Sequence, residues 1–389
     1  MNDGCAQRAF LSGNEAFACG VRLAGPKVIS AYPITPQTVV VERLSEMVED
    51  GSLAAEFIHV ESEHSALSCA MGACAAGVRT FTATSSQGLL YMAECLPYAA
   101  GGRFPIVMMN ANRAVALPWN IYGDQSDALS QLACGWIQAY AQSAQEGLDM
   151  VLLAYYTAEH PAVRTPFMVN LDGFHLTHTY EVVDIPARAD AEAFLPPFET
   201  DNRVDFDEPK NMAFSAGPGH CAVFKYKQHA AVLRARAVVA EAEERFARTF
   251  GRRYTGLVEN YMTQDAEYVL VTLGAVAGLC RDVAAQLRRA GVKAGVVRIR
   301  YMRPFPDAEL TAALESARAV AVLEKDISPG RAGAVFSEVL GVLAGRPALG
   351  AVGGLGGEDI AARDVHAIFD RLRAGETGVY FIGIGGVTI

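Results

Sequence analysis

Residues 267–298 read EYVLVTLGAVAGLCRDVAAQLRRAGVKAGVVR, and this stretch decides the class of fold. Its apolar run 267–273 predicts a buried strand, and Gly274 predicts the turn that follows it. The amphipathic stretch up to Ala290 predicts a helix, and 293–298 predicts the next strand. Together these segments form a compact βαβ unit. Further strands are predicted at 320–324 and 379–382, and further helices at 307–317, 332–343 and 360–373.

The same alternation of short strands and longer helices runs from Gly13 to about Asp184. It is typical of a parallel sheet with helices on both faces. The sequence therefore predicts an α/β protein with two doubly wound parallel-sheet domains. In this first part the predicted strands are 27–31, a strand ending at 59–60, 79–84, 105–110 and 166–170, and the predicted helices are 38–49, 65–76, 88–100, 127–138 and 146–159.

A segment of different composition joins the two predicted domains. Residues 185–218 are rich in Pro, Asp and Asn and have no hydrophobic period, which predicts an irregular connector over a surface. Loops of this length usually have a contact role, and in a subunit they often wrap a partner. The charged, Ala-rich stretch 224–250 predicts one helix of about seven turns. We therefore expect a first domain at 1–184, a connector and linking helix at 185–262, and a second domain at 263–389.

Length and composition fit this division. The chain has 389 residues, and since a domain typically has roughly 150 residues, two to three domains are expected. Hydrophobic residues make up 51% and charged residues 20%, which is typical of a folded globular chain. The net charge is −10, and no face of basic residues is visible in the sequence. Nucleic acid is therefore not an expected partner.

The sequence also indicates the compartment. No apolar stretch reaches the ~18 to 20 residues that span a bilayer, so no membrane span is expected. The N-terminus lacks the basic and apolar parts of a secretory signal, and we expect a cytoplasmic protein.

The cysteines do not form a metal-binding motif. The eight cysteines stand at positions 5, 19, 69, 74, 95, 134, 221 and 280, and no two are separated by only two residues. CxxC zinc and iron-sulfur motifs need that spacing. Any redox centre is therefore expected on another chain, and the cysteines are interpreted as buried structural thiols.

Four polar clusters each follow a predicted strand and precede a predicted helix. The carboxyl ends of parallel strands lie at one edge of a sheet, which is where ligands bind in open α/β sheets. We therefore expect these clusters to outline one site. They are Tyr32–Pro36, Glu61–His64, Thr84–Gln87 and Asn110–Arg113.

Two of these clusters carry charged side chains with alternative interpretations. Glu61 and Glu63 diverge at the entry to a helix, so only one is expected to point inward; alternatively, both are first-turn carboxylates favoured by the helix dipole. Arg113 is an isolated guanidinium that suits bidentate binding of a carboxylate. The alternative is a salt bridge to Asp124 or Asp127.

Three other motifs are assigned structural roles. His59-Val60-Glu61 has the HxE pattern of zinc deaminases, but no PCxxC follows it. His175 and His178 lack a third ligand and are interpreted as structural histidines. GGLGGED at 353–359 lacks the spacing of a phosphate-binding loop and is predicted to be a turn that starts a helix.

Several motifs in order along the chain resemble the alpha subunit of 2-oxoacid:ferredoxin oxidoreductases. The resemblance covers nearly the whole chain, and the pyruvate branch is the most similar. The motifs are YPITPQT (32–38), HVESEHSAL (59–67), TATSSQGLLYM (82–92) and NRAVALPWNIYGDQSD (112–127), followed by NLDGFHLTHT (170–179), LPPF (195–198), VRIRYMRPFP (297–306) and GLGGED (354–359).

The resemblance implies a thiamine diphosphate enzyme in which this chain supplies a pyrimidine-binding domain and a transketolase C-terminal-like domain. Glu63 is implied to be catalytic, because a carboxylate against the aminopyrimidine ring favours the imino tautomer that deprotonates the thiazolium carbon. Thr35 and Arg113 are implied to bind the carboxylate of the 2-oxo acid. The other residues implied to line the cofactor are Tyr32, Pro33, Ile34, Ser86 and Gln87.

The resemblance also implies partner subunits. Thiamine enzymes hold the diphosphate through Mg²⁺ on a GDG motif followed by an Asn, and this chain has no GDG. A beta subunit is therefore expected to hold the diphosphate and Mg²⁺, with gamma and delta-type subunits carrying iron-sulfur clusters. The implied reaction converts a 2-oxo acid and coenzyme A to an acyl-CoA, CO₂ and two low-potential electrons, which pass to ferredoxin or to an NAD-linked subunit.

Other substrates and roles remain open at this point. Oxalate would require an arginine where Thr35 stands, so threonine argues against it. Pyruvate is the favoured substrate, and an aromatic acid such as phenylglyoxylate is the alternative, with residues 117–122 as candidate pocket lining. A non-redox thiamine transferase or synthase component is a rival hypothesis, against which the long connector and YPITP count. A non-catalytic scaffold subunit is another, and the presence of Glu63 counts against it.

Overall fold

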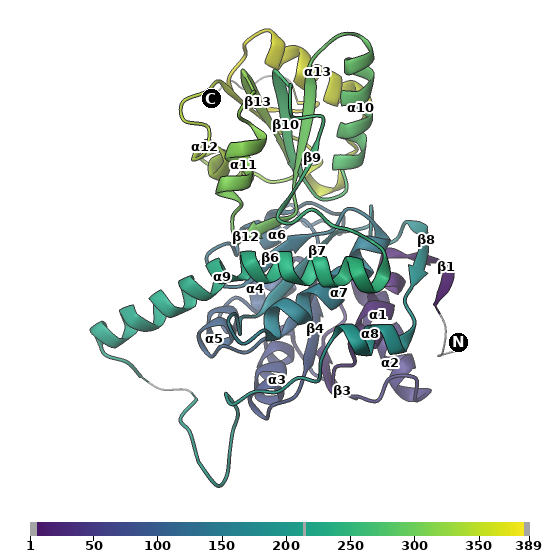
Figure 1. Cartoon of the computed structure of the whole chain (residues 1–389), viewed down its shortest axis with the longest axis vertical. Coiled ribbons are helices and arrows are strands. Elements are labelled where there is room, and N and C mark those ends of the chain that lie inside the picture. Colours follow the sequence, from purple (N-terminus) through teal and green to yellow (C-terminus); the bar gives the residue numbers. More distant parts are fainter. Residues whose placement is uncertain (1–5, 213–214, 385–389) are drawn as a thin grey trace.

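Seven strands form the first sheet of the computed structural model, which describes residues 6–212 and 215–384 (Figure 1). Their order is β12-β6-β7-β5-β4-β2-β3, and all pair in parallel except β12, which lies antiparallel to β6 at one edge. The predicted parallel sheet is therefore present, with one reversed edge strand. The strands are β2 (Val28–Ala31), β3 (Glu56–His59), β4 (Thr80–Thr84), β5 (Val107–Asn112), β6 (Ile137–Tyr140), β7 (Phe167–Asp172) and β12 (Tyr301–Arg303).

Helices cover both faces of this sheet. One face packs against α1 (Gly13–Ala24), α2 (Thr38–Glu49) and α7 (Ala144–Glu159). The other face packs against α3 (Glu63–Ala75), α4 (Ser86–Tyr91) and α5 (Cys95–Gly101). Side chains at the N-termini define where several helices start, since Ser12, Ser62 and Ser143 each accept a backbone N–H of the first turn.

The close packing of α1 against α7 depends on one glycine. A β-carbon at Gly20 of α1 would lie 2.7 Å from the carbonyl oxygen of Leu148 and 3.0 Å from a methyl group of Val151, both on α7. Any larger residue would therefore push α1 away from α7, and the small residue at this position sets the distance between the two helices.

The second sheet has six strands in the order β15-β14-β13-β10-β11-β9. All pair in parallel except β9, which is antiparallel to β11. Helices α10 (Ala277–Arg289) and α13 (Ala362–Arg373) cover one face, and α11 (Asp307–Ala313) and α12 (Ala334–Leu340) cover the other. The strands are β9 (Val258–Tyr261), β10 (Tyr268–Leu273), β11 (Ala294–Ile299), β13 (Ala319–Glu324), β14 (Ala348–Val352) and β15 (Gly378–Phe381).

The linking helix α9 (Pro218–Phe250) crosses the molecule beside both sheets, and its first turns extend away from them (Figure 1). Its buried residues lie at helical spacing and pack against α7 and α8 (Arg188–Phe194). They include Ala231, Ala235, Val238, Ala242 and Phe246. The stretch 215–227 is exposed throughout. A two-stranded antiparallel ribbon of β1 (Gln7–Ser12) and β8 (Tyr180–Ile185) completes the fold.

Four predictions of local structure were wrong. The predicted helix 127–138 is limited to α6 (Ser126–Leu129), and Ile137 begins a strand. The predicted helix 88–100 is two helices, α4 and α5, separated by a turn. The stretch FHLTHTYEV (174–182) has the pattern of a strand, but it is a turn up to Thr177 and becomes strand β8 only at Tyr180. The connector 185–218, of which residues 213–214 lie outside the described ranges, contains the short helix α8.

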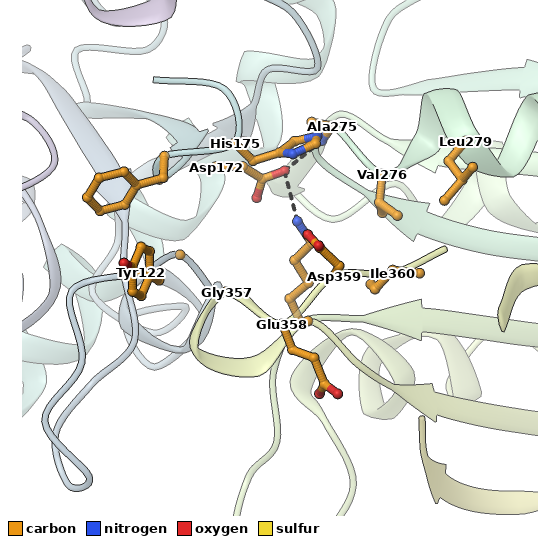
Figure 2. A pocket seen from close by; sticks show the side chains of 15 residues that line it. Tyr122, Asp172, His175, Ala275, Val276, Leu279, Gly357, Glu358, Asp359 and Ile360 are labelled. Atoms are coloured by element: carbon orange, nitrogen blue, oxygen red, sulfur yellow. Dashed lines mark hydrogen bonds and ion pairs between the residues drawn. The ribbon is translucent and has the colours of Figure 1, made fainter. Parts of the chain in front are cut away.

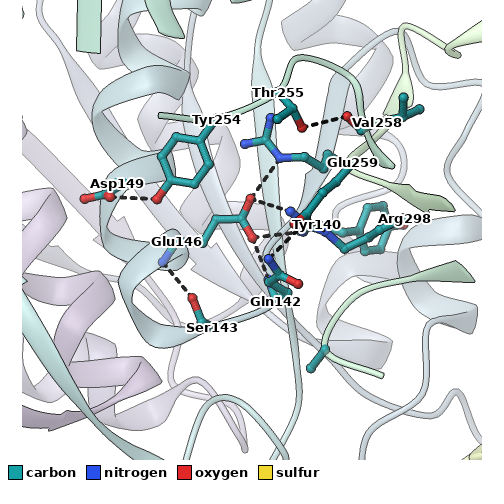
Figure 3. A network of polar contacts seen from close by, with 12 residues as sticks. Tyr140, Gln142, Ser143, Glu146, Asp149, Tyr254, Thr255, Val258, Glu259 and Arg298 are labelled. Carbon is teal, nitrogen blue, oxygen red and sulfur yellow. Dashed lines mark hydrogen bonds and ion pairs between the residues drawn. The ribbon is translucent and has the colours of Figure 1, made fainter. Parts of the chain in front are cut away.

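A buried ion network joins the two sheets through the motif at 297–306 (Figure 3). Arg298 lies near the end of β11 and Arg300 directly follows that strand, and both donate to the carboxylate of Glu146 on α7, at 2.9 to 3.0 Å. Arg300 also donates to Glu243 of α9 at 2.5 Å, and Arg298 to Glu259 of β9 at 2.8 Å. Burial alone would raise the pKa of Glu146, but the two guanidinium groups outweigh it and hold that pKa at about 2.

We predict that Glu146→Gln lowers the free energy of unfolding by about 3 kcal/mol, because it leaves two buried guanidinium groups short of a counter-charge. Thermal unfolding of the purified protein measures this change. The matched control is Glu244→Gln on α9, whose pair with Arg253 is exposed and should change stability by no more than about 0.5 kcal/mol. Equal effects of the two substitutions would contradict a special role for the buried network.

Candidate active site

The four polar clusters lie together along the edge of the first sheet that the carboxyl ends of its parallel strands form. Strands β5, β4, β2 and β3 are neighbours and run parallel, so their carboxyl ends point the same way. A direct contact joins two of the clusters, since Nη1 of Arg113 donates to the carbonyl oxygen of Thr35 at 3.0 Å. The structure thus places the predicted groups side by side, as the topology of a parallel sheet requires.

The buried side chain of Asp127 connects the loops that form this edge. It is fully buried in the first turn of α6. Its carboxylate accepts the backbone N–H of Ser86 at 3.0 Å and that of Arg113 at 3.1 Å. The side-chain amides of Asn110 and Asn112 donate to it at 3.1 and 2.9 Å, and both also donate to Asn170 of β7. One carboxylate therefore fixes the loop after β4 and the loop after β5 relative to each other.

Glu63 is the first residue of α3 and is buried. Ser62 caps the helix, and Glu63 lies against Thr84 and Gly88 of the neighbouring strand and helix. A β-carbon at Gly88 would lie 2.7 Å from a carboxylate oxygen of Glu63, so glycine is needed for this approach. Within the described residues the carboxylate of Glu63 has no hydrogen bond or ion pair.

Glu61 behaves differently from Glu63. It is exposed, and its carboxylate accepts the hydroxyl of Ser65. Of the two carboxylates, only Glu63 points inward, as expected from their divergence at a helix entry. The pKa of Glu61 is lowered, chiefly by that hydroxyl.

Arg113 is buried at the end of β5, with a side chain held on several sides. Its Nε donates to the carbonyl oxygen of Asn120 at 2.9 Å, and its guanidinium lies over the ring of Trp119 at 5.3 Å. Burial lowers its pKa, with Asp127 opposing that shift. In residues 6–212 and 215–384 it forms no ion pair with Asp124 or Asp127, and its Nη2 carries no hydrogen bond. The salt-bridge alternative is therefore wrong, and one end of the guanidinium is open.

The remaining predicted residues occupy the same edge with different exposure. Tyr32, Pro33 and Thr35 are exposed, and Ile34 is half-buried. Ser86 is buried, and its hydroxyl donates to the carbonyl oxygen of Ala114 at 2.6 Å. The hydroxyl of Ser86 therefore supports the loop after β5, whereas Gln87 is half-buried beside it.

Two of the motifs that were assigned structural roles lie in turns next to this edge. His175 and His178 are in the turn after β7, where His178 stacks on Phe174 at 4.8 Å. No group of three or more metal-ligating side chains occurs in the part of the chain that the structure describes. GGLGGED forms a short 3₁₀ turn before α13.

The cysteines of the described ranges are all free. Burial raises the pKa of Cys74 and of Cys280 to about 12, so these thiols are protonated at neutral pH. Cys221 is an exception to the expected burial, since it is exposed near the start of α9. Cys5 lies outside the described residues.

A cavity of about 380 Å³ separates the two sheets close to this edge (Figure 2). The loop after β7 contributes Asp172 and His175, and the second domain contributes Ala275, Val276 and the glycine-rich turn. Asp172 points toward the start of α10 and accepts the backbone N–H of Ala275 at 2.7 Å. The sequence alone did not single out Asp172, and it named Asp127 only as a possible salt-bridge partner of Arg113 and Asn120 only within the candidate pocket lining 117–122. Only Asp172 had a local signal, since it is a polar residue at the end of the apolar strand β7.

No helix of the described chain is long and apolar enough to cross a membrane.

Two family models match the chain. One, described as pyruvate flavodoxin/ferredoxin oxidoreductase, thiamine diP-binding, matches residues 19–244, and the other, pyruvate:ferredoxin oxidoreductase core domain II, matches residues 266–365. The first match ends within α9, and the second begins just before β10.

Curated relatives match almost the full length. The chain is 46% identical over 374 residues to pyruvate synthase subunit PorA of Methanothermobacter thermautotrophicus, covering 96% of this chain and 97% of that protein. It is 46% identical to PorA of Pyrococcus horikoshii, covering 91% of this chain and 90% of that protein. It is 41% identical to ketoisovalerate oxidoreductase subunit VorA of Pyrococcus horikoshii, covering 93% of each.

Solved structures share the fold. A 2-oxoglutarate:ferredoxin oxidoreductase from Magnetococcus marinus, with 2-oxoglutarate, coenzyme A and succinyl-CoA bound, superposes with a TM-score of 0.71 at 19% identity. The match covers 95% of this chain and 65% of that one. A split-gene transketolase, described as an inactive beta4 tetramer, gives a TM-score of 0.51 at 15% identity, covering 94% of this chain and 99% of that one.

Burial raises the pKa of Asp127 to about 6, although Asn112 and three backbone N–H groups favour the charged form. The folded protein therefore binds this proton more tightly than the unfolded chain, and we predict that stability falls as the pH rises from about 4 to about 6. The Asp127→Asn variant should lack this part of the pH dependence. It should also be less stable by about 1–3 kcal/mol at pH 7, because its amide cannot accept all of these donors.

Thermal unfolding of both proteins between pH 4 and pH 7 measures this difference. The exposed Asp282 of α10 provides the control, since Asp282→Asn should keep the slope of the unsubstituted protein. The same slope in the Asp127→Asn variant would show that the carboxylate does not titrate in this range.

Proposed function

Because this chain belongs to the family of alpha subunits of 2-oxoacid:ferredoxin oxidoreductases, we propose that it supplies the pyrimidine-binding and substrate-binding half of a thiamine diphosphate active site that oxidises pyruvate. The observation that carries the proposal is that Glu63 and Arg113 both lie at one edge of the first sheet. Each is buried, and each keeps a polar group that the described chain does not use.

The residues at this edge fit the aminopyrimidine end of thiamine diphosphate. A buried carboxylate without a partner in the described chain is costly unless an external donor binds it. Gly88 leaves no side chain between Glu63 and Thr84, whose buried hydroxyl is also unpartnered in the described chain. Both groups can therefore receive a ring nitrogen and an amine from outside the chain. When bound, the cofactor supplies the nucleophilic carbon and the electron sink for decarboxylation.

Glu63 is proposed to act as the acid-base group for the cofactor ring. Its carboxylate accepts or returns a proton at a ring nitrogen, which typically contributes about 10²- to 10⁴-fold to a rate. Tyr32, Pro33, Ile34, Ser86 and Gln87 are proposed to shape the walls around it.

Arg113 and Thr35 are proposed to bind the carboxylate of the 2-oxo acid. The guanidinium is already fixed by two carbonyl oxygens, those of Asn120 and Thr35, so little side-chain freedom is lost when it binds an anion. Arg113, Thr35 and Glu63 all follow strands at the same edge of the sheet. The guanidinium thus orients the acid, while the carboxylate of Glu63 handles protons.

The full reaction needs partner chains. The chain lacks the GDG motif that binds the diphosphate through Mg²⁺. We propose that a beta subunit supplies that half of the site, and that gamma and delta-type subunits with iron-sulfur clusters carry the electrons to ferredoxin or to an NAD-linked subunit. One 2-oxo acid anion and one coenzyme A then give one acyl-CoA, one CO₂, one proton and two electrons. We propose that the complex is cytoplasmic.

We predict that Glu63→Gln lowers the turnover of the assembled complex at least tenfold, because the amide cannot exchange the proton. Viologen reduction with pyruvate and coenzyme A measures the turnover, and size-exclusion chromatography checks assembly. Glu61→Gln is the matched control, since Glu61 is exposed two residues away and should leave turnover unchanged. Normal turnover in the Glu63→Gln complex would refute the catalytic role and favour a scaffold subunit.

Substrate preference is tested with the purified complex and three acids side by side: pyruvate, 2-oxoisovalerate and phenylglyoxylate. We expect the highest kcat/KM with pyruvate, because the PorA relatives reach 46% identity over most of the chain and the VorA relatives 41%. A preference for 2-oxoisovalerate or phenylglyoxylate would overturn pyruvate as the substrate and direct attention to residues 117–122.

A further inference from the structure

A turn of the second domain contacts the loop that carries the substrate-binding arginine. Asn120 donates its side-chain amide to the carbonyl oxygen of Gly356 at 2.9 Å, across 236 residues of sequence. The backbone N–H of Gly356 donates in turn to Asp124 at 3.1 Å. Both polar groups of one glycine in the second domain are therefore used by the loop 113–125 of the first.

This contact needs glycine. Gly356 has a φ of +59°, which side-chain-bearing residues rarely adopt. A β-carbon there would lie 2.6 Å from Nδ2 of Asn120. At Gly357, with a φ of +85°, a β-carbon would lie 2.4 Å from Cβ of Tyr122. Two consecutive glycines thus allow the turn to lie directly on the loop.

Asn120 also contacts Arg113. Its carbonyl oxygen accepts Nε of Arg113 at 2.9 Å, while its side-chain oxygen accepts the backbone N–H of Tyr122 at 2.6 Å. The carbonyl oxygen of Tyr122 accepts the backbone N–H of Ala114 at 3.1 Å, which closes the loop. The position of the Asn120 backbone therefore sets where the guanidinium is held, and Gly356 sets the position of Asn120.

A second contact fixes the second domain against this loop. The chain leaves β10 and β13 toward opposite sides of the sheet, which is where open α/β sheets form a ligand crevice. Asp172 of the first domain reaches this place, within 2.7 Å of the Ala275 N–H and 3.6 Å of Nζ of Lys325 (Figure 2). Gln125 donates to Asp172 at 2.9 Å, and its backbone N–H donates to the carbonyl oxygen of Lys325. The carboxylate of Asp172 thus occupies this crevice. It fixes the second domain, and with it the glycine-rich turn, against the loop 113–125.

We propose that the glycine-rich turn of the second domain takes part in recognition of the 2-oxo acid, with Asn120 and Gly356 as positioning residues for Arg113. The inference rests on the proposed role of Arg113 in binding the substrate carboxylate. A guanidinium held in its binding geometry before substrate arrives loses less freedom on binding, so the contact acts mainly on substrate affinity.

In the assembled complex, Asn120→Ala and Gly356→Ala should each raise the KM for the 2-oxo acid by about 3- to 10-fold, the effect of one hydrogen bond. Each should leave kcat within about twofold. The two substitutions break the same contact from opposite sides, so either one carries the test if the other does not assemble. Hydrogen-deuterium exchange of residues 113–125 gives a readout independent of turnover and should be faster in both variants.

Gly375→Ala is the matched control. Gly375 has a φ of +80° in the same domain, and a β-carbon there would meet nothing within 4 Å. The substitution introduces the same backbone strain without touching the loop, so KM and exchange of 113–125 should stay unchanged. An equal rise in KM in this variant would show a general effect of destabilising the domain and would overturn the proposal.

Combining Asn120→Ala with Arg113→Ala separates this inference from the proposed function. If Asn120 acts through Arg113, the double variant has the KM of Arg113→Ala alone. Multiplied effects, or a raised KM in Arg113→Ala with none in Asn120→Ala and Gly356→Ala, would overturn the positioning role and leave the substrate role of Arg113 standing. An unchanged KM in Arg113→Ala would overturn both.

Discussion

The hydrogen bonds to the buried carboxylate of Asp127 are the constraint on which the candidate site depends. Two loops that leave neighbouring strands have backbone N–H groups that no strand partner can satisfy at that point. Asp127 accepts one backbone N–H from each loop, and the side-chain amides of Asn110 and Asn112 also donate to it. The buried hydrogen bonds of Asp127 hold the two loops in place. The exposed residues of the site are therefore not needed to keep the loops together.

The two domains are joined by polar contacts of two kinds. On the side of α7 and α9, the guanidinium groups of Arg298 and Arg300 share Glu146 in a region without solvent. On the side of the site, Asp172 and Gly356 join the domains through partly solvated contacts. The buried side fixes the relative orientation of the domains, since a small shift there would leave buried charges without their partners. The second side lies next to the site, where small adjustments affect the loop 113–125 directly.

Much of the fold and part of the site could be predicted from the sequence. The apolar periods located most strands within one or two residues, and parallel topology alone brought Thr35, Glu63 and Arg113 to one edge. The prediction failed at 127–138, because IQAY at 137–140 is a strand only through its pairing with β7 and β12. The roles of Asp127 and Asn120 were also out of reach, since a contact across 236 residues leaves no local pattern. Short-range patterns identify the side chains at an edge, whereas the groups that hold them depend on tertiary structure.

The strand β12 has a consequence for how this chain can be divided. It follows β11 of the second sheet, yet it pairs with β6 and forms the outer edge of the first. A first domain made alone, ending before residue 301, would have the backbone groups of β6 unpaired along its edge. Such an edge is a template for pairing with other chains and favours aggregation. The two halves are therefore interleaved, and splitting this chain into two separate gene products would have to keep residues 301–303 with the first part.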